Sequence, residues 1–278
     1  AGMMSSSDDV VVAILAKDKA VTLPLYLSCL EIQTFPKERI HLYVRANDSS
    51  DNTVEVLRRW IDANGRFYKS VTVDYSDIGG LRHYGHHEWD VHRFRVLGQI
   101  RQASVDHARR LGCHYFVADA DTFVVPTTIE NMFESGLPVV APMVRTPYTE
   151  YSNFFPRADS DGYAIVGLPE YTQILTGRVR GFILVDVVHT AYFVRFDVLD
   201  QLCFDDGSGR VEYVIGSEVL RSRGIGQYLD NRQIYGVVGF LGGEAAQAWG
   251  GFDHVNFTWR VVNLSNEPMR IPNDETAY

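Results

Sequence analysis

The chain has 278 residues, 46% of them hydrophobic and 22% charged, and a formal net charge of −9. These values are typical of a globular protein built around one large domain. The acidic excess argues against a nucleic-acid backbone or an anionic membrane surface as the main partner, because both carry negative charge. No apolar run approaches the ~20 residues of a membrane span, so we expect no membrane partner.

The first half of the chain alternates apolar segments with helical patterns. The run VVVAILA at 10–16 is typical of a strand buried on both faces, and Thr22 and Pro24 indicate the start of a helix after it. A second helix is expected to begin at Ser50 or Asp51 and to end at an Asn-Gly pair. The elements expected in this half are, in chain order, a strand at 10–16, a helix at 23–33, a strand at 39–46, a helix at 51–64, a strand at 70–75, a helix at 91–111 and a strand at 114–118.

The second half has a less regular pattern. Its Gly-rich end is expected to lie over the domain rather than to form a domain of its own. The elements expected here are a strand within 137–143, an aromatic and Pro-rich loop at 144–162, a strand or hairpin leading into a helix within 180–199, a helix at 211–226 and a strand within 227–240.

Strands that alternate with helices indicate an α/β fold, with a parallel sheet covered by helices on both faces. Ligands of such sheets bind beyond the carboxyl ends of the strands. Polar residues follow three of the expected strands, namely Lys17-Asp18, Asn47-Asp48 and Asp119-Ala120-Asp121. We expect these three clusters to converge into one site.

Asp119 and Asp121, here called the acidic pair, follow the apolar strand in the stretch GCHYFVADADTFVVP. Two carboxylates at this spacing on a tight turn can share Mn²⁺ or Mg²⁺, which prefer oxygen ligands. Such a cation would let an acidic protein hold a nucleotide diphosphate and would stabilise the departing diphosphate. The small Ala120 between them would let a sugar approach the backbone. The alternative is a turn in which Asp121 bonds its own backbone.

Other polar residues also have two interpretations. Asn47 and Asp48 suit the imide edge of a uracil or the hydroxyls of a ribose, or they form an Asx-turn that starts the next helix. Arg101, on the long helix before the acidic pair, either faces a nucleotide or belongs to a solvated helix face.

A sugar transfer with inversion also needs a carboxylate base that takes a proton from the acceptor hydroxyl. Asp205, Asp206 and Glu212 lie where such a base would belong, although each alone is more often a turn or cap residue. Glu212 is favoured because it opens a helix beside an apolar stretch, and Asp206 comes next. The loop Tyr148–Phe155 is either an acceptor wall or buried packing.

Several stretches together resemble the procollagen galactosyltransferase family, in its amino-terminal glycosyltransferase domain. They occur in the family's order from about Val10 to Leu264. The acidic pair is common to many sugar transferases, whereas LPVVAPM followed by YSNFF is much more particular. The matching stretches are AILAKD, LPLYLSCLE, NDSSDNTVEVLRRW, YFVADADTFV, GLPVVAPM, YSNFF, VVHTAYFVR and DHVNF.

The resemblance implies a GT-A fold with a mixed, mostly parallel sheet. It implies Mn²⁺-dependent (or Mg²⁺-dependent) transfer of galactose, or next glucose, from a UDP-sugar to hydroxylysine of a collagen-like protein, with inversion. The acidic pair would bind the metal, with Asp253 or His254 as a third ligand. The family also has two consecutive Asp residues in its second half. Val211 stands at the first of these two positions here, and Glu212 stands at the second. The donor-site residues that the resemblance implies are Ala16, Asn47, Asp48, Arg101 and His189.

We expect a disordered tail or cloning remnant at 1–9, a single domain at 10–264 and a C-terminal tail at 265–278. Residues 10–126 would bind the nucleotide sugar and residues 127–264 the acceptor. No signal-peptide pattern is seen, which favours a cytoplasmic location over the endoplasmic reticulum lumen. A homodimer is compatible with the sequence.

Two other functions are open at this point. Relatives that lost activity exist, so the chain could be a catalytically inactive UDP-sugar-binding or interaction module of the same fold. A nucleotidyltransferase ranks last, because AILAKDKAVTLP lacks the Gly-rich basic loop that such an enzyme needs.

Overall fold

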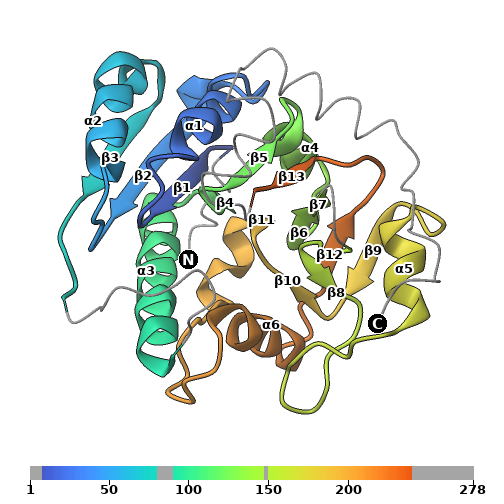
Figure 1. Ribbon diagram of the computed structural model, residues 1–278. Coiled ribbons are helices and arrows are strands. Elements are labelled where there is room, and N and C mark those ends of the chain that lie inside the picture. The colour runs from blue at the N-terminus through green and yellow to red at the C-terminus, as the bar shows by residue number, and fades with distance from the viewer. Residues whose placement is uncertain (1–7, 80–89, 147–149, 240–278) are drawn as a thin grey trace, which may run out of the picture.

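The computed structural model describes residues 8–79, 90–146 and 150–239. These residues form a domain with an eight-stranded mixed sheet at its centre (Figure 1). The order of its strands is β3-β2-β1-β4-β11-β6-β12-β9. The first four run parallel, and β11 lies antiparallel to both β4 and β6. The strands are β1 (Val10–Ala16), β2 (Ile40–Ala46), β3 (Ser70–Asp74), β4 (His114–Ala118), β6 (Val139–Pro142), β9 (Phe182–Val185), β11 (Ala191–Val194) and β12 (Gln227–Asp230).

Helices cover both faces of this sheet. One face packs against α1, α2 and α4, and the other packs against α3, α5 and α6 (Figure 1). The expected fold class, α/β of the GT-A type, is therefore confirmed in its layers. The helices are α1 (Leu23–Glu31), α2 (Thr53–Asn64), α3 (Val91–Leu111), α4 (Thr128–Glu134), α5 (Pro169–Leu175) and α6 (Glu212–Ser222), with short 3₁₀ turns η1 (Lys37–Arg39), η2 (Gly65–Phe67) and η3 (Phe196–Gln201).

Two small sheets complete the described fold. One has the strand order β5-β13-β7, and in the other β8 pairs antiparallel with β10. The first begins directly after the acidic pair, since β5 starts at the residue that follows Asp121. The strands are β5 (Thr122–Val124), β7 (Val144–Arg145), β8 (Phe154–Phe155), β10 (Val187–Val188) and β13 (Gly236–Val238).

The apolar run at β1 is buried on both faces, as predicted. Val12 and Ile14 belong to the core beneath α1, whereas Val11 and Ala13 belong to the core beneath α3. None of these four side chains is more than 1% exposed. Burial of this much apolar surface in two layers makes β1 the centre of the domain.

The long helix α3 has the predicted bounds, 91–111. Asp90 caps it, because its Oδ1 accepts a hydrogen bond from the Arg93 N–H at 2.8 Å. Gly112 ends it with a φ of 68°, a conformation that glycine adopts without steric cost. By contrast, α2 begins later than predicted, with Asn52 at the N-cap, although Asp51 still accepts a hydrogen bond from the Thr53 N–H.

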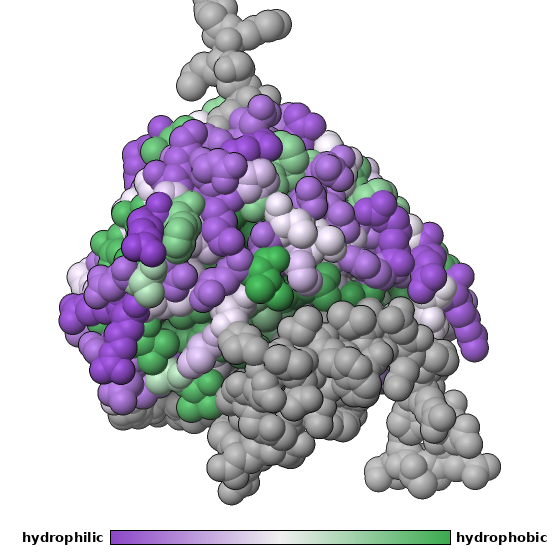
Figure 2. Space-filling model, turned by 90° about the horizontal axis from the view of Figure 1, so that it is seen from above, coloured by the Kyte–Doolittle hydropathy of each residue, from purple (hydrophilic) through white to green (hydrophobic). Residues whose placement is uncertain are grey.

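In the second half, the expected strand or hairpin is three strands, β9, β10 and β11, followed by η3. The described surface is largely hydrophilic when seen from above, with smaller apolar patches between the polar ones (Figure 2). Among the described residues, no helix combines the length and the apolarity that crossing a bilayer requires. The predicted domain limit at residue 264 lies outside the described residues.

Candidate active site

The loops after β1, β2 and β4 meet at the carboxyl edge of the large sheet. Lys17 Nζ donates to the carbonyl of Asp48 at 2.6 Å, and the Thr22 hydroxyl donates to the carbonyl of Ala120 at 2.9 Å. Lys19 Nζ lies 2.5 Å from Asp121 Oδ2. The three polar clusters that the sequence analysis expected to converge are thus brought together by direct contacts.

The acidic pair lies on the tight turn between β4 and β5. The turn is closed by the Thr122 N–H, which donates to the Asp119 carbonyl at 2.8 Å. Each carboxylate holds one cation of the protein: Asp119 Oδ1 accepts from Arg101 Nη2 at 2.7 Å, and Asp121 Oδ2 pairs with Lys19. Burial raises the pKa of Asp121, and the Lys19 ammonium opposes this rise.

Ala120, between the two aspartates, is 2% exposed. Its carbonyl is held by Thr22, which fixes the turn against the start of α1. The pair therefore presents hard oxygen donors from a rigid position, and it already binds one ammonium and one guanidinium cation. This donor set fits Mn²⁺ or Mg²⁺.

Arg101 joins the acidic pair to Glu212. Its Nε lies 3.2 Å from Glu212 Oε1, and its Nη2 binds Asp119, so one guanidinium bridges α6 and the turn after β4. The expectation that Arg101 lies at the site thus agrees with its contacts, and the alternative of a solvated helix face does not, because only 11% of its side chain is exposed.

Glu212 is a buried carboxylate at the first residue of α6. Its Oε2 and the Nη1 of Arg101 have no hydrogen-bond partner among the described residues. Burial raises the pKa of Glu212, while the Arg101 guanidinium lowers it. A buried oxygen without a partner is costly, so it indicates a position that a ligand group completes.

His189 lies beside the acidic pair on the segment between β10 and β11. Its Nδ1 shares a hydrogen bond with the Thr190 hydroxyl at 2.8 Å, and its ring packs against Tyr213 with 4.9 Å between the ring centres. Its Nε2 is buried without a partner among the described residues. Burial lowers the pKa of His189 to about 4, so the imidazole is neutral at pH 7.

Thr190 was not predicted as a site residue. Its φ is 68°, in the left-handed region that a β-branched residue rarely adopts. Its carbonyl accepts a hydrogen bond from the Asp119 N–H at 2.8 Å, so the strained residue fixes the acidic pair from the side of β11. Strain of this kind collects at functional sites.

The predicted nucleoside contacts are Ala16, Asn47 and Asp48. Ala16 ends β1 and is paired with Ala46 at the end of β2. Asn47 Nδ2 donates to Asp48 Oδ2 at 2.9 Å, and the same carboxylate accepts from two backbone N–H groups of the loop after β3, each at 3.1 Å. These hydrogen bonds outweigh the effect of partial burial and lower the pKa of Asp48.

Asp48 therefore fixes the loop after β3, not the start of α2. The Asx-turn that precedes α2 is made by Asp51 instead. Asn47 as a whole is 5% exposed.

Asp206 does not contact the acidic pair or Glu212. It lies on an exposed loop, where it forms an ion pair with Arg210 at 2.7 Å. Hydrogen bonds from Ser208 lower the pKa of Asp206 to about 2, which makes its carboxylate a weak base. His254, the predicted third metal ligand, lies outside the described residues, as does Asp253.

The loop at 150–155 packs into the domain. Asn153 is fully buried, and its amide group bonds the backbone of Val144 and Pro142 at 3.0 and 2.9 Å. The interpretation of this segment as buried packing therefore holds for Asn153 and for its neighbour Phe154. Tyr148 lies outside the described residues.

Sequence reasoning missed Lys19 as a site residue. It lies two residues after Lys17, at a sequence separation of 102 from Asp121, its partner. The available signal was its place in the loop after the first strand, since polar loops at carboxyl ends meet in this type of sheet.

A separate group of metal-ligand side chains lies at the opposite edge of the sheet. The ligand atoms of Asp9, His41 and Cys113 lie within 4.8 Å of one another. Lys69 Nζ already binds Asp9 Oδ2 at 2.5 Å. Asp9 precedes β1 and Cys113 precedes β4, so this group is at the amino ends of the strands, away from the acidic pair.

Comparison with known folds places the described architecture among glycosyltransferases. Staphylococcus aureus TarS in complex with UDP-GlcNAc matches with a TM-score of 0.55 and 13% identity, over 92% of this chain and 65% of TarS. The mannosyltransferase PcManGT from Pyrobaculum calidifontis, in complex with GDP-Man and Mn²⁺, matches with a TM-score of 0.51 and 14% identity, over 82% of this chain and 56% of that protein. At such identities the likeness shows the GT-A fold alone.

Sequence comparison gives the family. A Drosophila melanogaster glycosyltransferase 25 family member is 33% identical over 208 residues, which cover 72% of this chain and 33% of that protein. Human procollagen galactosyltransferase 2 is 30% identical over 246 residues, 83% of this chain and 38% of that protein. The human inactive glycosyltransferase 25 family member 3 is 34% identical over 203 residues, 70% of this chain and 33% of that protein.

The chain spans between a third and about two fifths of the length of these relatives. The family profile described as glycosyltransferase family 25, N-terminal domain, matches residues 7–241. This match covers the acidic pair, Arg101, His189 and Glu212. The chain belongs to glycosyltransferase family 25, and it carries the N-terminal domain of that family.

Proposed function

We propose that this domain transfers a hexose, galactose first and glucose next, from a UDP-sugar to the hydroxylysine of a collagen-like protein, with a divalent metal ion and with inversion. One observation carries the proposal. Arg101 connects Asp119 of the acidic pair to Glu212, a buried carboxylate with one oxygen that has no partner among the described residues. The aspartate that would help to bind the diphosphate and the glutamate that would act as the base thus lie on either side of the Arg101 guanidinium.

On the donor side, Asp119 and Asp121 would hold Mn²⁺ or Mg²⁺. When bound, the ion supplies positive charge that stabilises the departing diphosphate. Lys19 and Arg101 bring two positive charges of the protein to the same turn, where each pairs with one carboxylate of the acidic pair. Neutral His189 can form a hydrogen bond through Nε2 without adding charge.

On the acceptor side, Glu212 would take the proton. As the acceptor oxygen forms its bond to the anomeric carbon, the hydroxyl proton passes to Glu212 Oε2, and the bond from the anomeric carbon to the diphosphate oxygen breaks with its electron pair on UDP. The raised pKa of Glu212 suits a general base, because it matches the carboxylate more closely to a hydroxyl proton.

The relatives support the choice of substrates. Human procollagen galactosyltransferase 2 is named for galactose transfer to procollagen, and the matched fold of TarS was solved with UDP-GlcNAc. Since the chain covers only 38% of the human relative, the sugar and the acceptor are part of the proposal.

The test is to incubate the protein with Mn²⁺ and each UDP-sugar, and to measure released UDP with and without a hydroxylysine peptide. We expect UDP-galactose to give the largest peptide-dependent release. Glu212→Gln is expected to lower transfer by roughly a hundredfold or more, whereas the matched Asp206→Asn keeps it. Transfer by Glu212→Gln at the wild-type rate would reject the assignment of the base.

A second function has a specific likeness in its favour. The human inactive glycosyltransferase 25 family member 3 is 34% identical to this chain. A UDP-sugar-binding module without turnover would bind UDP equally well with and without Mn²⁺ and would release no UDP from any sugar nucleotide. The same incubations therefore separate the two functions.

A further inference from the structure

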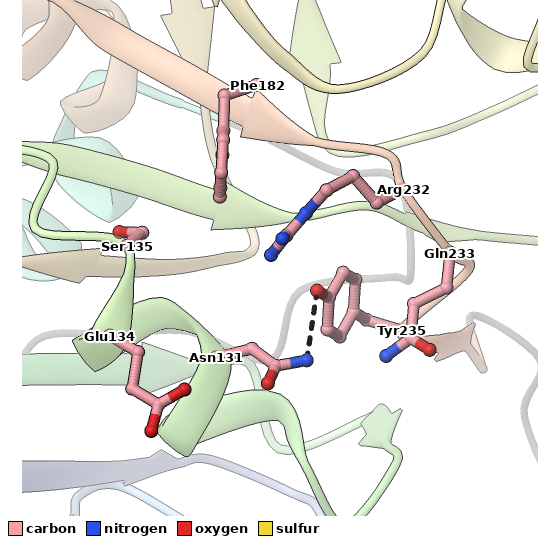
Figure 3. A pocket seen from close by; sticks show the side chains of 7 residues that line it. All are labelled: Asn131, Glu134, Ser135, Phe182, Arg232, Gln233 and Tyr235. Atoms are coloured by element: carbon pink, nitrogen blue, oxygen red, sulfur yellow. Dashed lines mark hydrogen bonds between the residues drawn. The ribbon is translucent and has the colours of Figure 1, made fainter.

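A polar pocket of about 450 Å³ lies beside α4, apart from the acidic pair. Its volume falls within the range of specific ligand sites. It is lined by side chains from the end of α4, from β9 and from the loop between β12 and β13, and Figure 3 shows these groups around a common space. The residues are Asn131, Glu134, Ser135, Phe182, Arg232, Gln233 and Tyr235.

The wall of this pocket is fixed by a buried carboxylate, Asp230. Arg232 binds it through two nitrogens, at 3.0 and 2.8 Å, and the Tyr235 hydroxyl donates to it at 2.6 Å. Asn131 Nδ2 donates to the same hydroxyl at 3.2 Å (Figure 3). The guanidinium also lies over the ring of Phe182, 4.2 Å from its centre. These contacts hold the pocket in one shape before any ligand binds.

Several groups of the pocket can still form hydrogen bonds or ion pairs with a ligand. Arg232 Nη1 and the side-chain oxygen Oδ1 of Asn131 make no hydrogen bond with another described residue, and the Arg232 side chain is about half exposed, at 48%. Glu134 is exposed at the rim and has no ion pair within the described residues. Since Asp230 neutralises Arg232, the pocket has an excess negative charge from Glu134.

An apolar strip continues the pocket along β9. Phe182 and Leu184 are two residues apart, so their side chains lie on the same face of this strand, and they are 39% and 55% exposed. β9 is the last strand of the large sheet. A ligand that lies across the pocket and this strip needs amide-type hydrogen bonds, apolar contacts and a positive charge. An extended polypeptide with basic side chains offers all three.

We propose that this pocket binds a basic, extended stretch of polypeptide and serves as a subsite for the acceptor chain. The inference rests on the proposed function in so far as it identifies that chain with the acceptor. Both oligosaccharides and peptides form hydrogen bonds with amides, but the aliphatic Leu184 beside the ring of Phe182 favours a peptide.

The chain between the pocket and the acidic pair gives the distance that an acceptor bound at both places would have to span. Tyr235 leads directly into β13, which pairs with β5, and the Gly239 N–H donates to the Asp121 carbonyl at 2.7 Å. Four residue steps of extended chain separate Tyr235 from Gly239, roughly 13 Å. An acceptor in a polyproline-type conformation, with about 3.1 Å per residue, would cover this distance in about four residues.

The test uses the full chain without a donor. A fluorescent oligo(Gly-Pro-Lys) peptide has no hydroxylysine, so it reports binding without reaction. We expect Phe182→Ala and Glu134→Lys each to raise its Kd by roughly tenfold. The matched controls on the α2 side, Phe67→Ala and Asp62→Lys, remove an exposed ring and reverse an exposed charge, and they are expected to keep the wild-type Kd within about twofold.

Three results would overturn the inference: Glu134→Lys binding as tightly as Asp62→Lys, oligo(Gly-Pro-Glu) binding as tightly as the lysine peptide, or Phe182→Ala weakening maltotriose but not the peptide. The last would make the pocket a glycan site. Because no donor is present, these outcomes are independent of UDP release. A wild-type protein that releases no UDP but shows the expected peptide differences counts against the proposed function alone.

Discussion

Arg101 and Glu212 form a buried ion pair, with 3.2 Å between Nε and Oε1, in which the same guanidinium also binds Asp119 at 2.7 Å. The two acidic groups lie on different elements, the turn after β4 and the first residue of α6. One cation thus opposes the effect of burial on the pKa of Glu212 and also binds one carboxylate of the acidic pair.

Removal of this cation is expected to shift the pH dependence of transfer. Arg101 lowers the pKa of Glu212 against the effect of burial, so Arg101→Gln raises that pKa further. A base must be deprotonated, and activity falls as the pH drops through its pKa. The acidic limb of kcat/KM in Arg101→Gln is therefore expected to lie at higher pH than in the wild type. An unmoved limb, in a variant with wild-type far-UV circular dichroism, would show that Glu212 is not the titrating base.

Under the proposed function, Lys19 would compete with a metal ion for Asp121. Its ammonium lies 2.5 Å from Asp121 Oδ2, at 29% side-chain exposure. Lys19→Met leaves the acidic pair with one cation fewer. We expect this variant to bind Mn²⁺ roughly tenfold more tightly, because the metal ion no longer has to break the ion pair between Lys19 and Asp121. The measurement is calorimetric Mn²⁺ titration without nucleotide. Lys17→Met, which loses contacts with Asp18 and with the Asp48 carbonyl but none with the acidic pair, is the control; weaker Mn²⁺ binding by Lys19→Met would contradict the prediction.

His189 is expected to make the fold sensitive to acid. Burial lowers the pKa of His189 to about 4, against about 6.5 in the unfolded chain. Below pH 6.5 the His189 imidazole is protonated in the unfolded state but stays neutral in the folded state. The free energy of unfolding therefore decreases as the pH falls from about 6.5 to 4. This group alone accounts for about 3 kcal/mol of that loss.

The test compares the wild type with His189→Asn. Urea unfolding at pH 7 and at pH 4.5 gives the change in the free energy of unfolding for each protein. The wild type is expected to lose more stability than the variant between these pH values. Equal losses would mean that the imidazole is solvated in the folded state.

Gly236 allows β13 to pack closely on β5. A Cβ at this position would lie 2.2 Å from the carbonyl oxygen of Phe123, which only a backbone movement can relieve. Gly236→Ala is therefore expected to lower the free energy of unfolding by ~2–3 kcal/mol. Because β13 links the pocket to Asp121, Mn²⁺ binding is expected to weaken as well. Gly65→Ala, which meets only two side chains at 3.3 Å, is the matched control for thermal unfolding. A thermal midpoint of Gly236→Ala equal to that of Gly65→Ala would contradict the close packing.

Local elements were largely predictable because their signals are local. α3 has both predicted bounds, since Asp90 caps its first turn and Gly112 supplies the left-handed residue at its end. The buried strands β1 and β4 were predicted from continuous apolar runs, which is the pattern of strands covered on both faces. The start of α2 was misplaced, because Asp51 bonds the Thr53 N–H without being the N-cap.

Local patterns in the chain were enough to predict the alternation of strands and helices and the place of the acidic pair after a buried strand. The strand order, with β11 inserted antiparallel between β4 and β6, was decided by the tertiary structure, because hydrogen bonds between distant strands leave no periodic signal in the chain. The same holds for Lys19 beside Asp121 and for Arg101 between Asp119 and Glu212. Glu212 and Arg101 are 111 residues apart, and only the packing of α6 against α3 turns two ordinary charged residues into one buried pair.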